Sequence, residues 1–191
     1  MKLYILINSS ETSPGLFGSQ LDKDGLEMAD NIVLKLDSLV IDDIYSSPFL
    51  STLQTIYPYC KKNDRTVNVE CGFYNKIYSY NGLLDRISIN NYQKHAFGYS
   101  YVLDIVNRNY KTRVFPNNIS QNEDNQDIIN RLFPLLYKIC KSRKNVLIVT
   151  HKSVLNYILY FFDRNVDLEK PINDEIIEIV LPNQSVVPEA N

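Results

Sequence analysis

The most constraining stretch of this chain is residues 146–155, where an apolar run ends in a histidine. Residues 146–149 read Val-Leu-Ile-Val, four consecutive apolar residues of which three are β-branched. That composition is typical of a buried parallel strand. After Thr150 and His151, apolar residues recur at helical spacing over residues 153–159. His151 is therefore predicted at the point where a strand ends and a helix begins, which is the edge of an α/β sheet where ligands bind.

Strands and helices alternate along most of the chain. Further strands are predicted at residues 3–7, 40–45, 67–69 and 176–181. Helices are predicted from Asp22 or Asp24 onward, over residues 49–59, from a start within residues 122–126, and after residue 152. This alternation predicts a three-layer α/β fold in which helices flank a mainly parallel sheet. The strand at 176–181 is expected near a sheet edge because Pro182 follows it.

Two segments carry more detailed predictions. The helix opening at Asp22 or Asp24 should bury one stripe of side chains, namely Leu26, Ala29, Ile32, Val33 and Leu36. Between residues 73 and 122 the periodicity fades and tyrosines accumulate, so we expect an insertion with short helices near the carboxyl edge of the sheet. His95, within that insertion, is interpreted as a packing residue. The whole chain, 1–191, is predicted to be a single domain.

Composition excludes several classes of function. The 191 residues are 45% hydrophobic and carry a formal net charge of −2, which argues against a nucleic-acid partner. The apolar segment 155–162 is too short to cross a membrane. Cys60, Cys71 and Cys140 match no metal-ligand spacing and are expected to be free, buried thiols. We therefore expect a cytoplasmic protein with no metal, no cofactor and no membrane partner.

Five short segments, in order, follow a known family pattern. That pattern has Arg-His-Gly-Glu-Thr after the first strand, and this chain has Asn-Ser-Ser-Glu-Thr at residues 8–12. Similar matches follow: Leu-Asp-Lys-Asp-Gly-Leu-Glu-Met-Ala at 21–29, Ser-Ser-Pro-Phe-Leu-Ser-Thr-Leu-Gln-Thr at 46–55, Val-Glu-Cys-Gly-Phe-Tyr-Asn at 69–75 and Val-Thr-His-Lys at 149–152. The chain thus resembles the histidine phosphatase superfamily, the phosphoglycerate-mutase-like enzymes. The resemblance implies a phosphoglycerate-mutase-like fold over residues 3–154.

The resemblance also implies where catalytic groups should stand. In that family a first His is the phosphorylated nucleophile, two Arg and a second His hold the phosphate, and a carboxylic acid protonates the leaving group. The corresponding residues here are Ser9 for the nucleophile, Asn8 and Ser51 for the two arginines, and Asn75 for the acid. Only His151 keeps the residue type of the family. An amide cannot act as a general acid, and losing two arginines removes charge-assisted hydrogen bonds worth about 1.5–3 kcal/mol each.

Our main interpretation is a pseudoenzyme, a protein of this fold with a binding or structural role. The four replacements are uncharged and of modest size, so they can bond one another as a neutral network or accept a neutral ligand. The natural partners would be a small neutral or phosphorylated ligand or another protein.

Two alternatives remain open from the sequence. In the first, Ser9 and His151 act as nucleophile and base of a residual or altered hydrolase, with Glu11, Glu70 or Glu123 as candidates to orient the imidazole. In the second, the chain is a sensor of a phosphorylated small molecule, which His151 and backbone N–H groups at the following helix start would bind.

Overall fold

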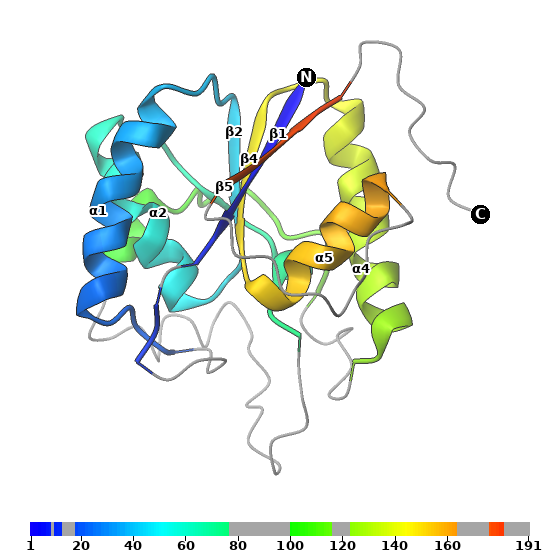
Figure 1. Ribbon diagram of the computed structural model, residues 1–191, viewed down its shortest axis with the longest axis horizontal. Coiled ribbons are helices and arrows are strands. Elements are labelled where there is room, and N and C mark those ends of the chain that lie inside the picture. The colour runs from blue at the N-terminus through cyan, green and yellow to red at the C-terminus, as the bar shows by residue number, and fades with distance from the viewer. Residues whose placement is uncertain (9, 13–17, 77–99, 116–122, 164–175, 182–191) are drawn as a thin grey trace.

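Five strands form one sheet, with the order β3-β2-β4-β1-β5 (Figure 1). The computed structural model describes residues 1–8, 10–12, 18–76, 100–115, 123–163 and 176–181. The strands are β1 (Lys2–Ile7), β2 (Asp43–Ser46), β3 (Asn68–Val69), β4 (Val146–Thr150) and β5 (Ile176–Val180). The first four run parallel, while β5 pairs with β1 in the antiparallel direction. The prediction of a mainly parallel sheet with its last strand at an edge is confirmed.

Helices cover both faces of the sheet (Figure 1). Helices α1 (Lys23–Asp37) and α2 (Leu50–Lys62) pack on one face, and α4 (Asn125–Lys141) and α5 (Lys152–Phe162) on the other. Strand β4 is buried throughout, and its side chains alternate between the two cores. Leu147 and Val149 face α1 and α2, whereas Val146 and Ile148 face α4 and α5. The three-layer α/β architecture is therefore as predicted.

The stripe predicted for α1 is wrong at one position. Asp22 is the N-cap, its side chain accepting a hydrogen bond from the Gly25 backbone N–H. Gly25 is buried, whereas Leu26 is 47% exposed. A Cβ atom at Gly25 would collide with the carbonyl oxygen of Ser10. This close approach of two backbones fixes which face of α1 turns inward, and Leu26 falls outside that face.

Strand and helix bounds differ slightly from those predicted. Strand β2 begins at Asp43 rather than at residue 40, where Val40 is 68% exposed. Helix α2 continues past Pro58 to Lys62. Val67 precedes β3 and forms a parallel bridge with Val106. The predicted strand starts were wrong because apolar residues alone do not mark where a strand begins to pair with its neighbour.

Only parts of the predicted insertion at 73–122 can be placed. A 3₁₀ helix, η1 (Cys71–Phe73), follows β3, and a second, η3 (Ser100–Ile105), packs against α2. Residues 77–99, with His95, and residues 116–122 lie outside the described residues. An insertion over the carboxyl edge therefore stays a prediction.

The three cysteines are buried and free, as expected. Burial raises the pKa of Cys60 to about 12 and the pKa values of Cys71 and Cys140 to about 11. Such thiols remain protonated and unreactive at neutral pH. Among the described residues, no helix is both long enough and apolar enough to cross a membrane.

The close approach at Gly25 can be tested by substitution. Gly25→Ala should lower the free energy of unfolding by about 1–3 kcal/mol, because the added methyl group displaces the Ser10 carbonyl. Helix propensity alone would favour alanine by up to about 1 kcal/mol, so the sign of the change is diagnostic. Gly18→Ala is the matched control, since a Cβ there meets nothing within 4 Å. Urea denaturation that shows equal stability for the two variants would contradict the packing.

Candidate functional site

Polar residues follow all four parallel strands at one edge of the sheet. Asn8 follows β1, Ser47 follows β2, Glu70 follows β3 and His151 follows β4. Backbone hydrogen bonds keep these strand ends level. The N–H of Asn8 donates to the Thr150 carbonyl at 2.9 Å, and the N–H of Ser47 donates to the Val149 carbonyl at 2.9 Å. The four side chains therefore start from one carboxyl edge, as the sequence predicts for a ligand site.

His151 stands directly before α5 and is 3% exposed. Its Nε2 lies 2.9 Å from the hydroxyl oxygen of Ser47. The ring of Phe49 packs edge-on against the imidazole, with ring centroids 4.4 Å apart. Burial, together with the positive charge of Arg131, lowers the pKa of His151 from 6.5 to about 3. The imidazole is therefore neutral at physiological pH.

A carboxyl group lies where the family pattern has its two arginines. The Asn8 side-chain amide donates a hydrogen bond to Glu11 Oε1. The Ser51 hydroxyl donates to the same oxygen at 2.8 Å, and the Asn8 Nδ2 and Ser51 Oγ atoms are 3.5 Å apart. Glu11 Oε1 therefore accepts both hydrogen bonds, while Oε2 is buried and accepts none from the described residues. Asn8, Glu11 and Ser51 thus form one contact cluster, which we call the Glu11 cluster.

Local structure fixes both sides of the Glu11 cluster. Ser51 is fully buried in the first turn of α2. Glu11 lies in a short antiparallel bridge with Leu21, and the N–H of Thr12 donates to the Gln20 carbonyl at 2.9 Å. The side-chain oxygen of Gln54, one turn along α2 from Ser51, accepts a hydrogen bond from the Leu21 N–H at 2.8 Å. The segment bearing Glu11 is therefore held against α2 by its neighbours.

Glu70, a candidate to orient His151, has a different role. Its carboxyl group is fully buried and accepts hydrogen bonds from the Tyr110 and Thr112 hydroxyls at 2.5 and 2.7 Å. The backbone N–H groups of Arg113 and Val114 add contacts at 2.9 and 3.1 Å. This bonding raises the pKa of Tyr110, for which burial is the larger cause. Glu70 fastens residues 110–114 to the end of β3.

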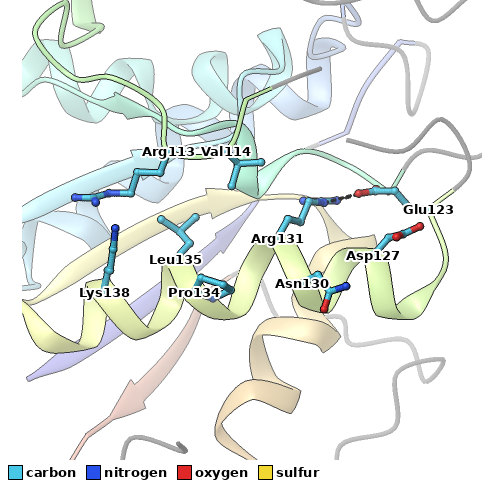
Figure 2. Close-up of a pocket in the computed structure, with 9 residues that line it drawn as sticks. All are labelled: Arg113, Val114, Glu123, Asp127, Asn130, Arg131, Pro134, Leu135 and Lys138. Carbon is cyan, nitrogen blue, oxygen red and sulfur yellow. Dashed lines mark hydrogen bonds and ion pairs between the residues drawn. The ribbon is translucent and has the colours of Figure 1, made fainter. Parts of the chain in front are cut away.

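Glu123, the third candidate, forms a buried ion pair with Arg131. Arg131 Nε donates to Glu123 Oε1 at 2.6 Å, and Nη2 donates to Oε2 at 3.0 Å (Figure 2). Arg131 also donates to the carbonyl oxygens of Gly72 and Tyr74, at 2.5 and 3.0 Å. The pair clamps η1 and the residues after it to α4. Sequence reasoning did not anticipate this clamp.

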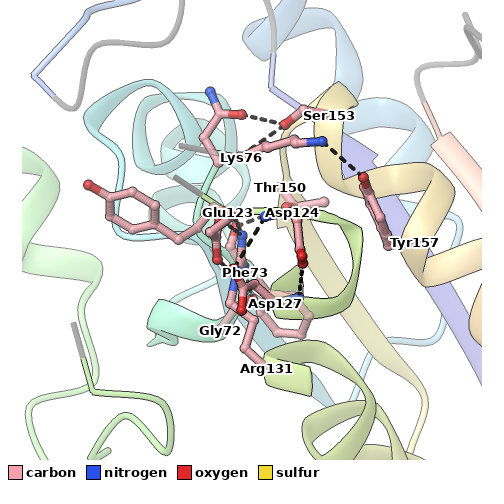
Figure 3. A network of polar contacts seen from close by, with 12 residues as sticks. Gly72, Phe73, Lys76, Glu123, Asp124, Asp127, Arg131, Thr150, Ser153 and Tyr157 are labelled. Carbon is pink, nitrogen blue, oxygen red and sulfur yellow. Dashed lines mark hydrogen bonds and ion pairs between the residues drawn. The ribbon is translucent and has the colours of Figure 1, made fainter. Parts of the chain in front are cut away.

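Asn75, at the general-acid position of the family pattern, lies beside the start of α5. Its side-chain oxygen accepts a hydrogen bond from the Ser153 hydroxyl. The backbone N–H of Lys76 donates to the Ser153 oxygen at 3.3 Å, and the Lys76 ammonium lies 3.3 Å from the Tyr157 hydroxyl (Figure 3). Asn75 therefore belongs to a polar network that joins residues 75–76 to α5.

Comparisons with known proteins support the fold. No family model and no curated protein matches the sequence. Solved structures do match. The alpha-ribazole phosphatase from Shigella flexneri is 16% identical, with a TM-score of 0.67 over 96% of this chain and 92% of that one. YhfR from Bacillus stearothermophilus is 17% identical, with a TM-score of 0.66 over 98% and 96% of the two chains.

A phosphoserine phosphatase from Entamoeba histolytica, in complex with 3-phosphoglyceric acid, is 14% identical with a TM-score of 0.62 over 94% and 90% of the two chains. The chain has the fold of the histidine phosphatase superfamily. At these levels of identity the likeness establishes the fold alone. The residues at the strand edge must decide the chemistry.

The structure places most of the predicted site residues. Asn8 and Ser51 contact each other within the Glu11 cluster, and His151 lies on the neighbouring strand end. Asn75 is in the network at α5. Ser9 lies outside the described residues, so its pairing with His151 stays a prediction. Sequence reasoning missed Ser47 as the partner of His151, although its place directly after the second strand was a usable signal.

The low pKa of His151 predicts how stability depends on pH. Below about pH 6.5 the unfolded chain binds a proton at this imidazole, while the folded protein does not until about pH 3. The free energy of unfolding should therefore fall as the pH drops through this window, by at most about 1.4 kcal/mol per pH unit from this residue. His151→Gln should flatten that slope.

Proton NMR titration of the His95→Gln variant measures the remaining histidine directly. The His151 ring signal should stay that of the neutral imidazole throughout the range in which the protein is folded. A midpoint near 6.5 would show that the imidazole is exposed to solvent and would contradict its burial against Phe49.

Proposed function

We propose that this chain is a pseudoenzyme: it has the histidine phosphatase fold but neither binds nor transfers a phosphoryl group at the strand edge. The Glu11 cluster is the observation that carries the proposal. Asn8 and Ser51, at the two arginine positions, donate hydrogen bonds to the carboxyl group of Glu11. An incoming phosphate would meet a carboxylate there in place of two guanidinium groups.

The replacement of two arginines by Asn8 and Ser51 should weaken phosphate binding strongly, for electrostatic reasons. Each lost arginine removes a charge-assisted contact worth about 1.5–3 kcal/mol. A carboxyl group at Glu11 also supplies no positive charge to an oxyanion, and any negative charge on it would repel the phosphate more strongly in a partly buried position than in water. A phosphate that took the hydrogen bonds of Asn8 and Ser51 would also leave Glu11 Oε1 without its two donors, which is a further free-energy cost. The effects act in the same direction, against an oxyanion at this edge.

The chemistry of the reaction is missing as well. His151 is neutral, and its Nε2 already contacts the Ser47 hydroxyl, so it supplies no positive charge for a phosphate. Asn75 cannot donate a proton as a general acid, and its side-chain oxygen is bonded to Ser153. A nucleophilic role for Ser47 is disfavoured because its side chain is fully buried. These contacts support a binding or structural role and argue against a sensor of phosphorylated molecules at this edge.

Activity measurements test the proposal. Purified protein should hydrolyse an aryl phosphate no faster than the Ser9→Ala, His151→Ala double variant, and no acid-labile phosphohistidine should form. The double variant is the matched control because it removes both groups of the alternative hydrolase. A rate in the wild-type protein that disappears in this variant would favour the hydrolase and refute the pseudoenzyme.

A further inference from the structure

A pocket of about 460 Å³ lies beside α4, and none of the three Glu11 cluster residues lines it (Figure 2). It is formed between α4, Glu123 just before that helix, and the two residues 113–114. Val114, Pro134 and Leu135 give it an apolar surface in the middle. Its volume lies within the range of about 300–1,000 Å³ that is usual for small-molecule sites. None of its lining residues belongs to the strand edge described above.

One end of the pocket is cationic. Arg113 and Lys138 come from different segments, and their charged groups point toward the same end of the pocket (Figure 2). Neither forms an ion pair with an acidic side chain within the described part of the chain. The nearby carboxyl group of Glu70 is already bonded to two hydroxyls and several backbone N–H groups. A guanidinium beside an ammonium is suited to a carboxylate or a phosphate.

The other end of the pocket accepts hydrogen bonds. Asp127 and Asn130 line it, together with the ion pair of Glu123 and Arg131 (Figure 2). Asp127 Oδ2 accepts from the Asp124 backbone N–H at 3.2 Å, and Asn130 Oδ1 accepts from the Gln126 side chain at 2.8 Å. A carboxylate has about four acceptor positions, so Asp127 can accept further hydrogen bonds. Hydroxyl groups of a ligand would be suitable donors at this end.

We propose that this pocket binds a small polyhydroxylated anion, such as a sugar phosphate or a sugar acid. The anionic group lies against Arg113 and Lys138, an apolar face of the ligand packs on Val114 and Pro134, and hydroxyls donate to Asp127 and Asn130. Phosphate and carboxylate share the chemistry that the cationic end recognises. This inference does not depend on the pseudoenzyme proposal, because the two sites have no residue in common.

Four probes test the proposal on the full chain. Glucose 6-phosphate and glucuronate carry both features of the ligand, whereas glucose lacks the anion and inorganic phosphate lacks the hydroxylated ring. Isothermal titration calorimetry should detect binding of at least one of the two anionic sugars at millimolar concentration, and the stronger of them identifies the preferred anionic group. The methyl NMR signals of Val114 and Leu135 should shift in the same titration.

Charge variants locate the site. Arg113→Gln with Lys138→Gln should weaken binding by at least about tenfold, because two charge-assisted contacts are lost. Arg108→Gln with Lys141→Gln is the matched control: it removes the same two charges from the same segments but outside the pocket, and it should leave the affinity unchanged. Several results would overturn the proposal: no binding of either anionic sugar, equal affinity for inorganic phosphate or glucose, or equal weakening in the two double variants.

Discussion

The buried strand β4 is the constraint on which the rest of the structure depends. All five of its residues are buried, with alternate side chains in the cores on the two faces of the sheet. Its carbonyl groups fix the strand ends on both sides, by accepting hydrogen bonds from Asn8 after β1 and from Ser47 after β2. Because a shift of one residue would exchange the two cores, this register is strongly specified. The positions of Asn8, Ser47 and His151 follow from that register.

Several polar side chains at the strand edge are bonded to one another, although the buried Oε2 atom of Glu11 accepts no hydrogen bond within the part of the chain that the structure describes. The Glu11 cluster joins the segment after β1 to α2, the Ser47 and His151 contact joins β2 to β4, and the Asn75 network joins the segment after η1 to α5. Phosphoryl transfer needs groups whose interactions strengthen when a charged transition state forms. Here such groups are replaced by uncharged donors that already have partners within the protein. The proposed loss of phosphate chemistry is therefore compatible with a stable fold of this kind.

The architecture could be predicted from the sequence because it depends on patterns that extend over whole strands and helices. The apolar run at 146–149 and the alternation of elements were enough for the three-layer sheet. The exposure of Leu26 could not be predicted from the sequence. It depends on the contact between Gly25 and the Ser10 backbone, which belong to different segments and are not related by helical spacing. Asn8, Ser51 and Asn75 were identified only through the family resemblance. The hydrogen-bond partners of Glu11, Glu70 and Glu123 lie in other segments of the chain. Composition and residue spacing do not show which segments come close together.

A crystal structure of the protein soaked with an oxyanion tests the account most directly. Tungstate, a tetrahedral oxyanion like phosphate, is a suitable probe for crystals of this protein. The account predicts that Glu11 keeps its hydrogen bonds to Asn8 and Ser51, that His151 keeps its contact with Ser47, and that no tungstate lies between them. Tungstate bound to Ser51 and His151, with Glu11 turned away, would contradict the account.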